Sequence, residues 1–436
     1  MSLHHRGPQQ PLLDSGAGSY GSLTARDSSH STDETAVPET RRLGSSTETF
    51  FHIVCITAGT GILQLPYALK SGGWIGVFYI ALAAAISAYS GKILIRCLYY
   101  KPGERLRSYS DVAEAAFGPR GRLVVRTLKD VNLLGVVGIY IVLAGISIDS
   151  LLVSSAAGDL GPRFWMGLSA LAVWAAIVSA RQIHDIFVLS AFGTLTTVLM
   201  VIIVVWLGVG DYEFLGTRPP TKFADIRMAP ISLASICFSF GGNLNWPDLE
   251  ASMKSPKKWG RVLTLSTAFI AFIYLGVAVV GYGVYGDTVR SPIFLSLPPG
   301  IPVVVAKAMI TAHVLFACPI LLTAVFIEAE HDLLGIDAMG SMSAAKERLC
   351  RAAFRTLLML AIACFALFVS DFSKIVPVLG AIAASMVVFV IPVACYLRLF
   401  NDQRQFTAME YAWCGLIVCT GLGCLVIGTS QAIMDM

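Results

Sequence analysis

The chain has 436 residues, of which 56% are hydrophobic and 14% are charged, and its mean hydropathy is +0.71. A typical soluble domain carries about 25% charged residues, so a soluble fold with one core is excluded and lipid must solvate much of the surface. The formal net charge is only +4, and no Lys/Arg-rich patch alternates with aromatic residues. A nucleic-acid partner is therefore not expected.

Residues 1–45 are rich in Gly, Ser, Thr and Pro and lack hydrophobic periodicity. Such a segment buries too little apolar surface to offset the entropy lost on ordering, which predicts a disordered cytosolic tail. No apolar stretch precedes Phe50, so the tail does not resemble a cleaved secretory signal. The first membrane helix is expected to direct insertion.

Eleven apolar runs follow, and each approaches the roughly 20 residues that cross the hydrocarbon core as an α-helix. Spanning strands are not expected, because the alternating pattern of outer-membrane barrels is absent. The sequence therefore predicts an all-α membrane protein with eleven transmembrane helices. The runs lie at about 47–70, 73–99, 129–154, 163–180, 185–208, 229–249, 262–285, 301–327, 352–370, 375–398 and 411–431.

Lysines and arginines predict the orientation of these helices, because cytosolic loops carry an excess of them. When the tail is taken as cytosolic, most of the loop cations fall on the inner side, so the N-terminus is expected to be cytosolic. The few outer cations are Arg163, Arg218, Lys222, Arg227, Arg290 and Lys374.

Two of the runs combine helix-breaking and polar residues at mid-membrane depth. The first run contains Gly59, Thr60, Gly61, Gln64 and Pro66. The sixth run contains the same kinds of residue five helices later, so both helices are predicted to be interrupted. The sixth-run residues are Ser239, Gly241, Gly242, Asn243, Asn245 and Pro247.

Paired interruptions predict a binding site as well as a shape. In an inverted-repeat transporter they hold the substrate, because unwound N–H and C=O groups need polar partners. Half-helix N-termini favour a carboxylate and exposed carbonyls favour an ammonium group, so an amino acid suits both. The alternative is that glycine and proline serve kinks or close helix packing. Two interruptions in register, holding two of the four asparagines in the chain, favour the binding site.

Motifs at these breaks resemble those of the amino acid/auxin permease family, in particular the vacuolar amino-acid transporters and the vesicular inhibitory amino-acid transporter. The resemblance covers nearly everything after residue 47. The motifs are Gly59–Ala68 (GTGILQLPYA), Gly72–Gly76 (GGWIG), Tyr89–Leu94 (YSGKIL), Phe238–Gly242 (FSFGG) and Pro247–Glu250 (PDLE).

The resemblance implies that residues 46–436 form one transmembrane transporter domain with a LeuT-like fold. Two inverted five-helix repeats, at about 47–208 and 229–398, precede an eleventh helix at about 411–431. Substrate is then expected at the breaks of helices one and six. The residues expected to bind it there are Thr57, Ala58, Gly59, Thr60, Gly61, Ser239, Gly241, Gly242 and Asn243.

Polar residues elsewhere in the membrane are further candidates, because such groups are costly in lipid. Asn132 and Tyr140 are eight residues apart and share a helix face, so they are expected at the substrate site, with bonding between helices as an equal alternative. By the resemblance, Tyr140 binds the substrate carboxylate. The ion-coupling candidates are His52, Thr311 and His313, and for the two histidines a structural hydrogen bond is the competing interpretation.

One further charge lies at the inner end of the sixth run. Glu250 is expected to be an interface charge or a gate partner of Lys254 rather than a proton carrier.

Three functions stay open at this point. The first is a proton-coupled carrier of neutral amino acids in a vacuolar or other acidic endomembrane, the branch that the resemblance implies. His52 stands at a position where many relatives carry asparagine, and this difference bears on which ion is coupled. The second is a sodium-coupled plasma-membrane importer, and the third is an amino-acid sensor with a partner-binding tail. An enzyme is not expected, since no nucleophile, metal cluster or phosphate loop occurs in a suitable context. Neither a metal nor a cofactor is predicted, and the expected partners are the amino acid, the coupling proton or sodium ion, and the lipid bilayer.

Overall fold

A computed structural model describes residues 44–153, 160–179, 186–214, 219–334, 344–403 and 405–434. Almost all of the predicted tail, residues 1–45, lies outside this description. Within it the chain is helical apart from turns, loops and one isolated bridge between Gly44 and Met253. The prediction of an all-helical fold is thus confirmed for the described residues.

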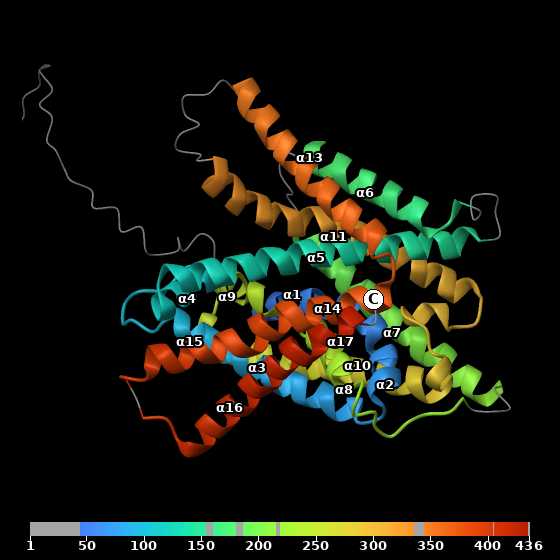
Figure 1. Cartoon of the computed structure of the whole chain (residues 1–436), viewed down its shortest axis with the longest axis horizontal. Coiled ribbons are helices and arrows are strands. Elements are labelled where there is room, and N and C mark those ends of the chain that lie inside the picture. The colour runs from blue at the N-terminus through green and yellow to red at the C-terminus, as the bar shows by residue number, and fades with distance from the viewer. Residues whose placement is uncertain are drawn as a thin grey trace, which may run out of the picture. The chain divides into compact units, whose positions relative to one another are not determined.

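The helices pack side by side as a bundle (Figure 1). The α-helices are α1 (Ser46–Thr57), α2 (Leu65–Gly72), α3 (Gly76–Leu98), α4 (Tyr109–Phe117), α5 (Pro119–Leu152), α6 (Pro162–Ser179), α7 (Ile186–Phe214), α8 (Ala229–Ser239), α9 (Trp246–Ser252), α10 (Trp259–Tyr285), α11 (Ile301–Leu334), α13 (Ala344–Phe368), α14 (Phe372–Leu379), α15 (Ile391–Phe400), α16 (Ala408–Gly423) and α17 (Thr429–Met434). The 3₁₀ segments are η2 (Thr60–Gln64), η4 (Gly242–Asn245), η5 (Pro256–Lys258), η6 (Gly286–Thr288) and η7 (Ile293–Leu295), and the π-helical segments are η8 (Gly380–Val390) and η9 (Cys424–Gly428).

Eight helices in the described part of the chain are long and apolar enough to cross a membrane, and nine if the bent pair Ser46–Thr57 and Thr60–Gly72 is one span. The fourth predicted run forms a shorter apolar helix over Pro162–Val178, and the sixth forms two short helices around η4. The total of eleven spans and the five-plus-five repeat stay predictions.

Two helices begin well before the apolar runs that predicted them. The run at about 129–154 belongs to α5, which begins at Pro119, and the run at about 352–370 belongs to α13, which begins at Ala344. Both extensions are rich in arginine and other polar residues. Hydropathy marks the part of a helix that suits lipid and misses a polar turn that continues beyond it.

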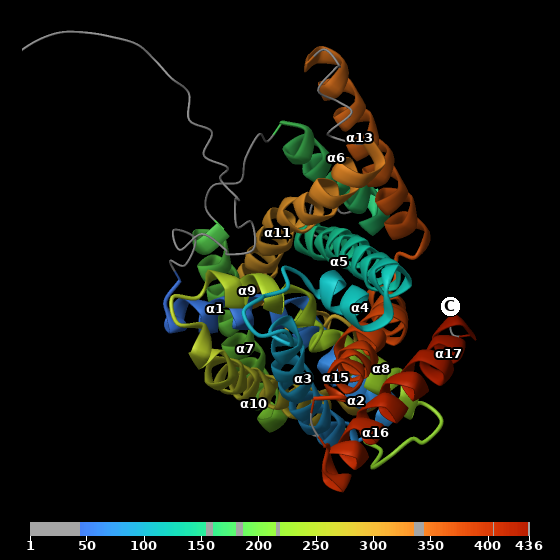
Figure 2. The same cartoon turned by 90° about the vertical axis from the view of Figure 1, so that its left-hand side faces the viewer.

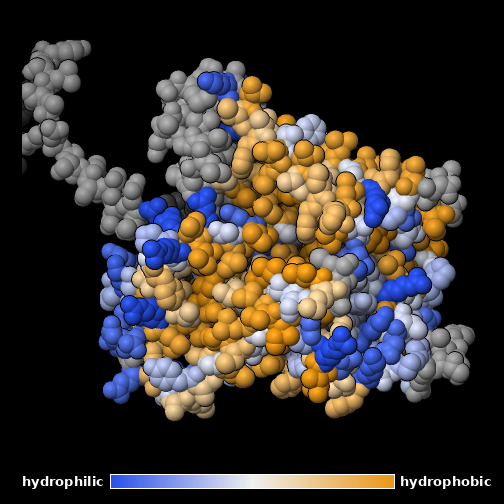
Figure 3. Space-filling model, in the orientation of Figure 1, coloured by the Kyte–Doolittle hydropathy of each residue, from blue (hydrophilic) through white to orange (hydrophobic). Residues whose placement is uncertain are grey.

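The surface has the distribution of polarity that a membrane protein needs. In Figure 3 hydrophobic residues cover the middle of the visible face, between two hydrophilic ends. Large apolar side chains such as Phe272, Leu357 and Val426 are 74%, 69% and 68% exposed. So much exposed apolar surface is unfavourable in water and is stable against lipid tails.

The bundle has two parts that meet along α5 and α11. Helices α5, α6, α11 and α13 pack against one another, and α11 also contacts α7 (Figures 1 and 2). On the other side α2 packs against α8 and α10, and α8 packs against η8. The two interrupted segments therefore lie in the interior.

The first helix begins at a complete capping box. The Ser45 hydroxyl accepts a hydrogen bond from the Glu48 amide, and the Glu48 carboxylate accepts one from the Ser45 amide. Directly before it, the Gly44 amide donates to the Ser252 carbonyl at 3.1 Å and its carbonyl accepts from the Lys254 amide at 2.8 Å. These bonds fix the start of α1 beside the end of α9.

Candidate helix-break site

The first break separates α1 from α2. The α-helix ends at Thr57, a 3₁₀ turn runs over Thr60–Gln64, and the axis bends by 42° between the two halves. Pro66 lies in the first turn of α2, where its missing N–H costs no helical hydrogen bond. The predicted interruption is therefore present.

The second break has the same design. Helix α8 ends at Ser239, the 3₁₀ segment η4 covers Gly242–Asn245, and α9 begins with Pro247 in its first turn. Gly59 and Gly241 each precede a 3₁₀ turn without a side-chain cap. Each break thus brings a helix C-terminus and a new helical N-terminus to one place, with backbone groups that intrahelical bonds do not satisfy.

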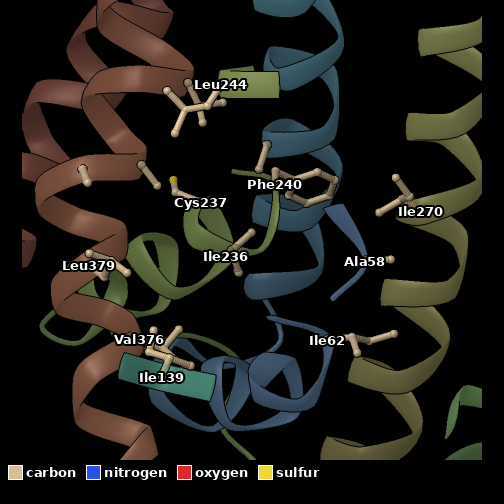
Figure 4. Close-up of a cluster of buried hydrophobic side chains, with 14 of the residues drawn as sticks. Ala58, Ile62, Ile139, Ile236, Cys237, Phe240, Leu244, Ile270, Val376 and Leu379 are labelled. Carbon is tan, nitrogen blue, oxygen red and sulfur yellow. The ribbon is translucent and has the colours of Figure 1, made fainter. Parts of the chain in front are cut away.

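The two breaks touch each other through glycines. A Cβ atom on Gly61 would lie 2.8 Å from the Cα atom of Ser239, so a larger residue there would push the backbones apart. A Cβ atom on Gly242 would lie 2.7 Å from the Thr57 hydroxyl oxygen. Apolar residues surround this contact, including Ala58, which Figure 4 shows within the buried cluster.

One hydroxyl group links both breaks. The buried side chain of Tyr274, on α10, lies 2.7 Å from the Thr57 carbonyl oxygen and 2.7 Å from the Ser239 carbonyl oxygen. These carbonyls end α1 and α8, and a single hydroxyl proton is shared between them. Tyr274 lies in an apolar run and carries no sequence signal of this role, so sequence analysis missed it.

A cavity of about 60 Å³ lies against this junction. Asn132 and Tyr140 both line it from α5, so the two residues share one helix face. Neither side chain has a hydrogen-bond partner within the described ranges, and the hydroxyl oxygen of Thr57 is also buried without one. The cavity is lined by Ile56, Thr57, Gly59, Thr60, Gly61, Asn132, Val136, Tyr140, Phe238, Ser239 and Gly241.

Three residues predicted at the site do not line this cavity. Ala58 and Gly242 pack in the contact between the breaks. The side-chain amide of Asn243 donates to the Ser90 hydroxyl at 3.0 Å and to the Val388 carbonyl at 3.4 Å, which connects η4 to α3 and η8. Asn243 anchors the second break in this conformation.

The ion-coupling candidates lie apart from the cavity lining. His313 on α11 is 4% exposed, and its Nδ1 atom has no hydrogen-bond partner among the described residues. A Cβ atom on Gly193 of α7 would lie 2.7 Å from both His313 Nδ1 and Cys55 Sγ, so the imidazole lies between α7 and α1. The Thr311 hydroxyl donates within its own helix to the Lys307 carbonyl, and His52 is half-buried on α1.

Beyond the first break, Gln64 forms a buried polar junction. Its amide nitrogen lies 3.4 Å from both the Ser235 hydroxyl and the Ser373 carbonyl, and its carbonyl oxygen accepts from the Ser291 hydroxyl at 3.1 Å. One side chain thereby joins α8, α14 and the loop that contains Ser291 to the broken helix. Sequence analysis noted Gln64 as a polar residue at the break and missed this connecting role.

At the other end of the second break, the prediction that pairs Glu250 with Lys254 is wrong. Arg105 forms the ion pair instead, with nitrogen–oxygen distances of 2.8 and 3.1 Å, and the Tyr99 hydroxyl donates to the same carboxylate at 2.7 Å. The Arg105 and Glu250 side chains are 10% and 1% exposed. The short helix α9 turns Glu250 inward toward the loop after α3, while Lys254 lies beyond the helix end and is exposed.

Comparison with known protein families identifies the family of this chain. The family model described as transmembrane amino acid transporter protein matches residues 42–434. The chain belongs to this family. It is therefore an integral membrane transporter of amino acids and not an enzyme.

Relatives and solved structures extend this result. The transporter is 28% identical to amino acid transporter AVT1E and 27% identical to AVT1B, both from Arabidopsis thaliana; the alignments cover 91% and 87% of this chain and 74% and 69% of the relatives. It shares its fold with MhsT, solved in complex with L-phenylalanine, at 12% identity and a TM-score of 0.53 over 87% of this chain and 98% of MhsT. The inward-facing conformation of Mhp1 has a TM-score of 0.59 at 10% identity, covering 91% and 92%.

Proposed function

We propose that this transporter carries a neutral amino acid by alternating access and holds it between the breaks of α1/η2 and α8/η4. The observation that carries the proposal is the convergence of two interrupted helices on one cavity, in whose lining the buried Thr57 hydroxyl has no hydrogen-bond partner among the described residues. The ends of α1 and α8 supply partial negative charge, and the starts of η2 and η4 supply partial positive charge. A zwitterion complements both.

The choice of a neutral substrate follows from the lining. No residue that lines the cavity carries a formal charge. A cationic or anionic side chain would lose its hydration there without a counter-ion, which costs several kcal/mol. The unpartnered Asn132 and Tyr140 side chains supply hydrogen bonds to the substrate, and the Tyr140 hydroxyl is the proposed donor to its carboxylate.

The size of the cavity supports a change of conformation during transport. About 60 Å³ is far below the roughly 300–1,000 Å³ of typical ligand pockets. Entry of a substrate therefore requires α1 and α8 to move relative to α5. Two sets of contacts close the side of the bundle where α1 begins. Gly44 bonds to Ser252 and Lys254, and Arg105 pairs with Glu250 of α9, so these contacts must break for that side to open.

We further propose that protons drive transport, through His313 or His52. His313 is buried next to α1, the helix that ends at the cavity, and the Nδ1 atom is available to bind a proton. Histidine is the side chain whose ordinary pKa lies near physiological pH. The family resemblance supports an acidic endomembrane such as the vacuole, and the excess of loop cations on one side supports a cytosolic N-terminus. Sodium coupling through Thr311 and unwound carbonyls is the alternative.

Uptake into liposomes tests the proposal. The full chain is reconstituted, and uptake of labelled neutral amino acids is measured with a proton gradient, with a sodium gradient and with neither. Proton-driven uptake is the expected result. Sodium-driven uptake would contradict proton coupling but not the proposed substrate site. Substrate binding without any uptake would contradict the carrier function and favour a sensor.

A blocking variant tests the site in the same assay. Val136→Trp places an indole ring in the cavity from α5 and is expected to abolish uptake. Val131→Trp is the matched control, because Val131 lies on the same helix, does not line the cavity and is 43% exposed. Equal uptake by the two variants would place the substrate elsewhere.

A further inference from the structure

A second and larger cavity lies between α3, α9, α10 and α15, at the end of the bundle where α1 begins. Its volume is about 830 Å³, within the range of small-molecule pockets. None of its lining residues lines the cavity between the breaks. The residues are Lys92, Ile95, Arg96, Tyr99, Glu250, Pro256, Lys257, Trp259, Gly260, Tyr396 and Phe400.

Three cations line this cavity without a counter-ion. Lys92 and Arg96 lie one turn apart on α3, and Lys257 lies in η5 directly before α10. In the part of the chain that the structure describes, none of the three side chains has a hydrogen bond or an ion pair. Lys92 is partly buried and Arg96 and Lys257 are exposed, and an anion that binds in the cavity they line is attracted by all three.

The one carboxylate in the lining does not offset this charge. Glu250 is fully engaged by Arg105 and by the Tyr99 hydroxyl. The N-terminus of α10 adds further positive potential, because Trp259 and Gly260 in its first turn also line the cavity. The Trp259 amide itself donates to the Pro256 carbonyl, so the contribution of this helix start is that of the helix dipole, which favours an anion near the N-terminus.

The rest of the wall is apolar and aromatic. Ile95, Trp259, Tyr396 and Phe400 supply carbon surface beside the cations. Tryptophan and tyrosine at such a position are typical of the interface between lipid tails and water. A ligand that matches the whole cavity therefore has an anionic head and an apolar part, which a free inorganic anion lacks.

We propose that this cavity binds the phosphate-bearing headgroup of an anionic membrane lipid. Phosphate oxygens accept hydrogen bonds from Lys92, Arg96 and Lys257, and the glycerol and upper acyl carbons pack on the aromatic wall. Basic pockets between membrane helices are suited to such headgroups. The proposal does not depend on which amino acid is carried or on the coupling ion.

Binding to the purified full chain in neutral detergent tests this. The probes are dioctanoyl phosphatidylinositol 4-phosphate, dioctanoyl phosphatidylcholine, inositol 1,4-bisphosphate and inorganic phosphate. The expected result is saturable binding of the phosphoinositide, with at least tenfold weaker binding of the other three. Binding of soluble inositol bisphosphate as tight as that of the lipid would overturn the lipid assignment, and equal binding of phosphatidylcholine would overturn the role of charge.

Variants locate the site. Each of Lys92→Gln, Arg96→Gln and Lys257→Gln is expected to weaken phosphoinositide binding about fivefold, the effect of roughly 1 kcal/mol per cation near an anionic lipid. Lys258→Gln is the matched control, because Lys258 is adjacent and exposed but does not line the cavity. The charge-conserving Lys92→Arg variant is expected to bind normally. Equal affinity of the Lys257 and Lys258 variants and the unmodified chain would contradict the assigned site.

Discussion

The two helix breaks contain the same kinds of residue and are used differently. The first break presents Thr57, Gly59, Thr60 and Gly61 to the cavity and bends by 42°. The second contributes Phe238, Ser239 and Gly241, and the segment after them is held by side chains. Asn243 bonds to α3 and η8, and Glu250 bonds to the loop after α3.

This difference shows that the pattern of glycine, proline and polar residues marks where a membrane helix is interrupted without assigning its polar groups. A polar side chain at a break either faces the substrate or satisfies the backbone of a neighbouring helix. Partners decide between these roles. The Thr57 hydroxyl is buried without a partner within the described ranges, whereas the Asn243 amide nitrogen donates to Ser90 and Val388 and only its carbonyl oxygen is left without a partner there.

The largest effect is expected where the second break is anchored by charge. Glu250→Gln leaves Arg105 buried without its counter-ion and is expected to lower the free energy of unfolding by about 3–5 kcal/mol. Thermal unfolding of the detergent-purified protein measures this. The control is Glu104→Gln, whose pair with Lys101 is more than half exposed and whose loss is expected to cost less than about 1 kcal/mol. Equal losses would show that the Arg105–Glu250 pair does not anchor α9.

The next effect is expected at the hydroxyl shared by both breaks. Tyr274→Phe leaves two buried carbonyls without their donor and is expected to lower the free energy of unfolding by about 1–3 kcal/mol. The variant is also expected to lose uptake. Tyr282→Phe, on the same helix, is the comparison. In this variant the Lys222 amide loses its hydroxyl acceptor, but the amide lies in a loop, where water replaces the hydroxyl. An unchanged uptake in Tyr274→Phe would contradict the view that this residue couples the breaks.

Removing the Asn243 side chain is expected to lower stability by a smaller amount and to leave substrate binding unchanged. Asn243→Ala loses the bonds to Ser90 and Val388, which lowers stability by about 1–2 kcal/mol. The KM for substrate is expected to stay within about twofold, since this side chain does not line the cavity. A large rise in KM with unchanged stability would restore Asn243 to the substrate-binding residues.

Local sequence signals predicted the helical fold, both interruptions and the family, because each depends on residues that are close together in the chain. Contacts over long separations were not predictable in this way. Arg105 is one of many loop cations and nothing in the sequence singles it out, and Tyr274 looks like any aromatic residue in an apolar run. The pairing of Glu250 with its sequence neighbour Lys254 failed for the same reason, since the partner Arg105 comes from the distant loop between α3 and α4.

The smallest effect on stability is expected at the first break's cavity, where the effect on function is specific. Asn132→Ala removes a side chain without a partner within the described ranges, so stability is expected to change by no more than about 0.5 kcal/mol. Its KM is expected to rise about five- to tenfold, the value of one hydrogen bond of roughly 1–1.4 kcal/mol to the substrate. Asn132→Ala and Asn243→Ala thus reverse each other's pattern in two assays. If both variants changed stability alone, neither asparagine would bind substrate, and the backbone groups of the breaks would have to hold the amino acid by themselves.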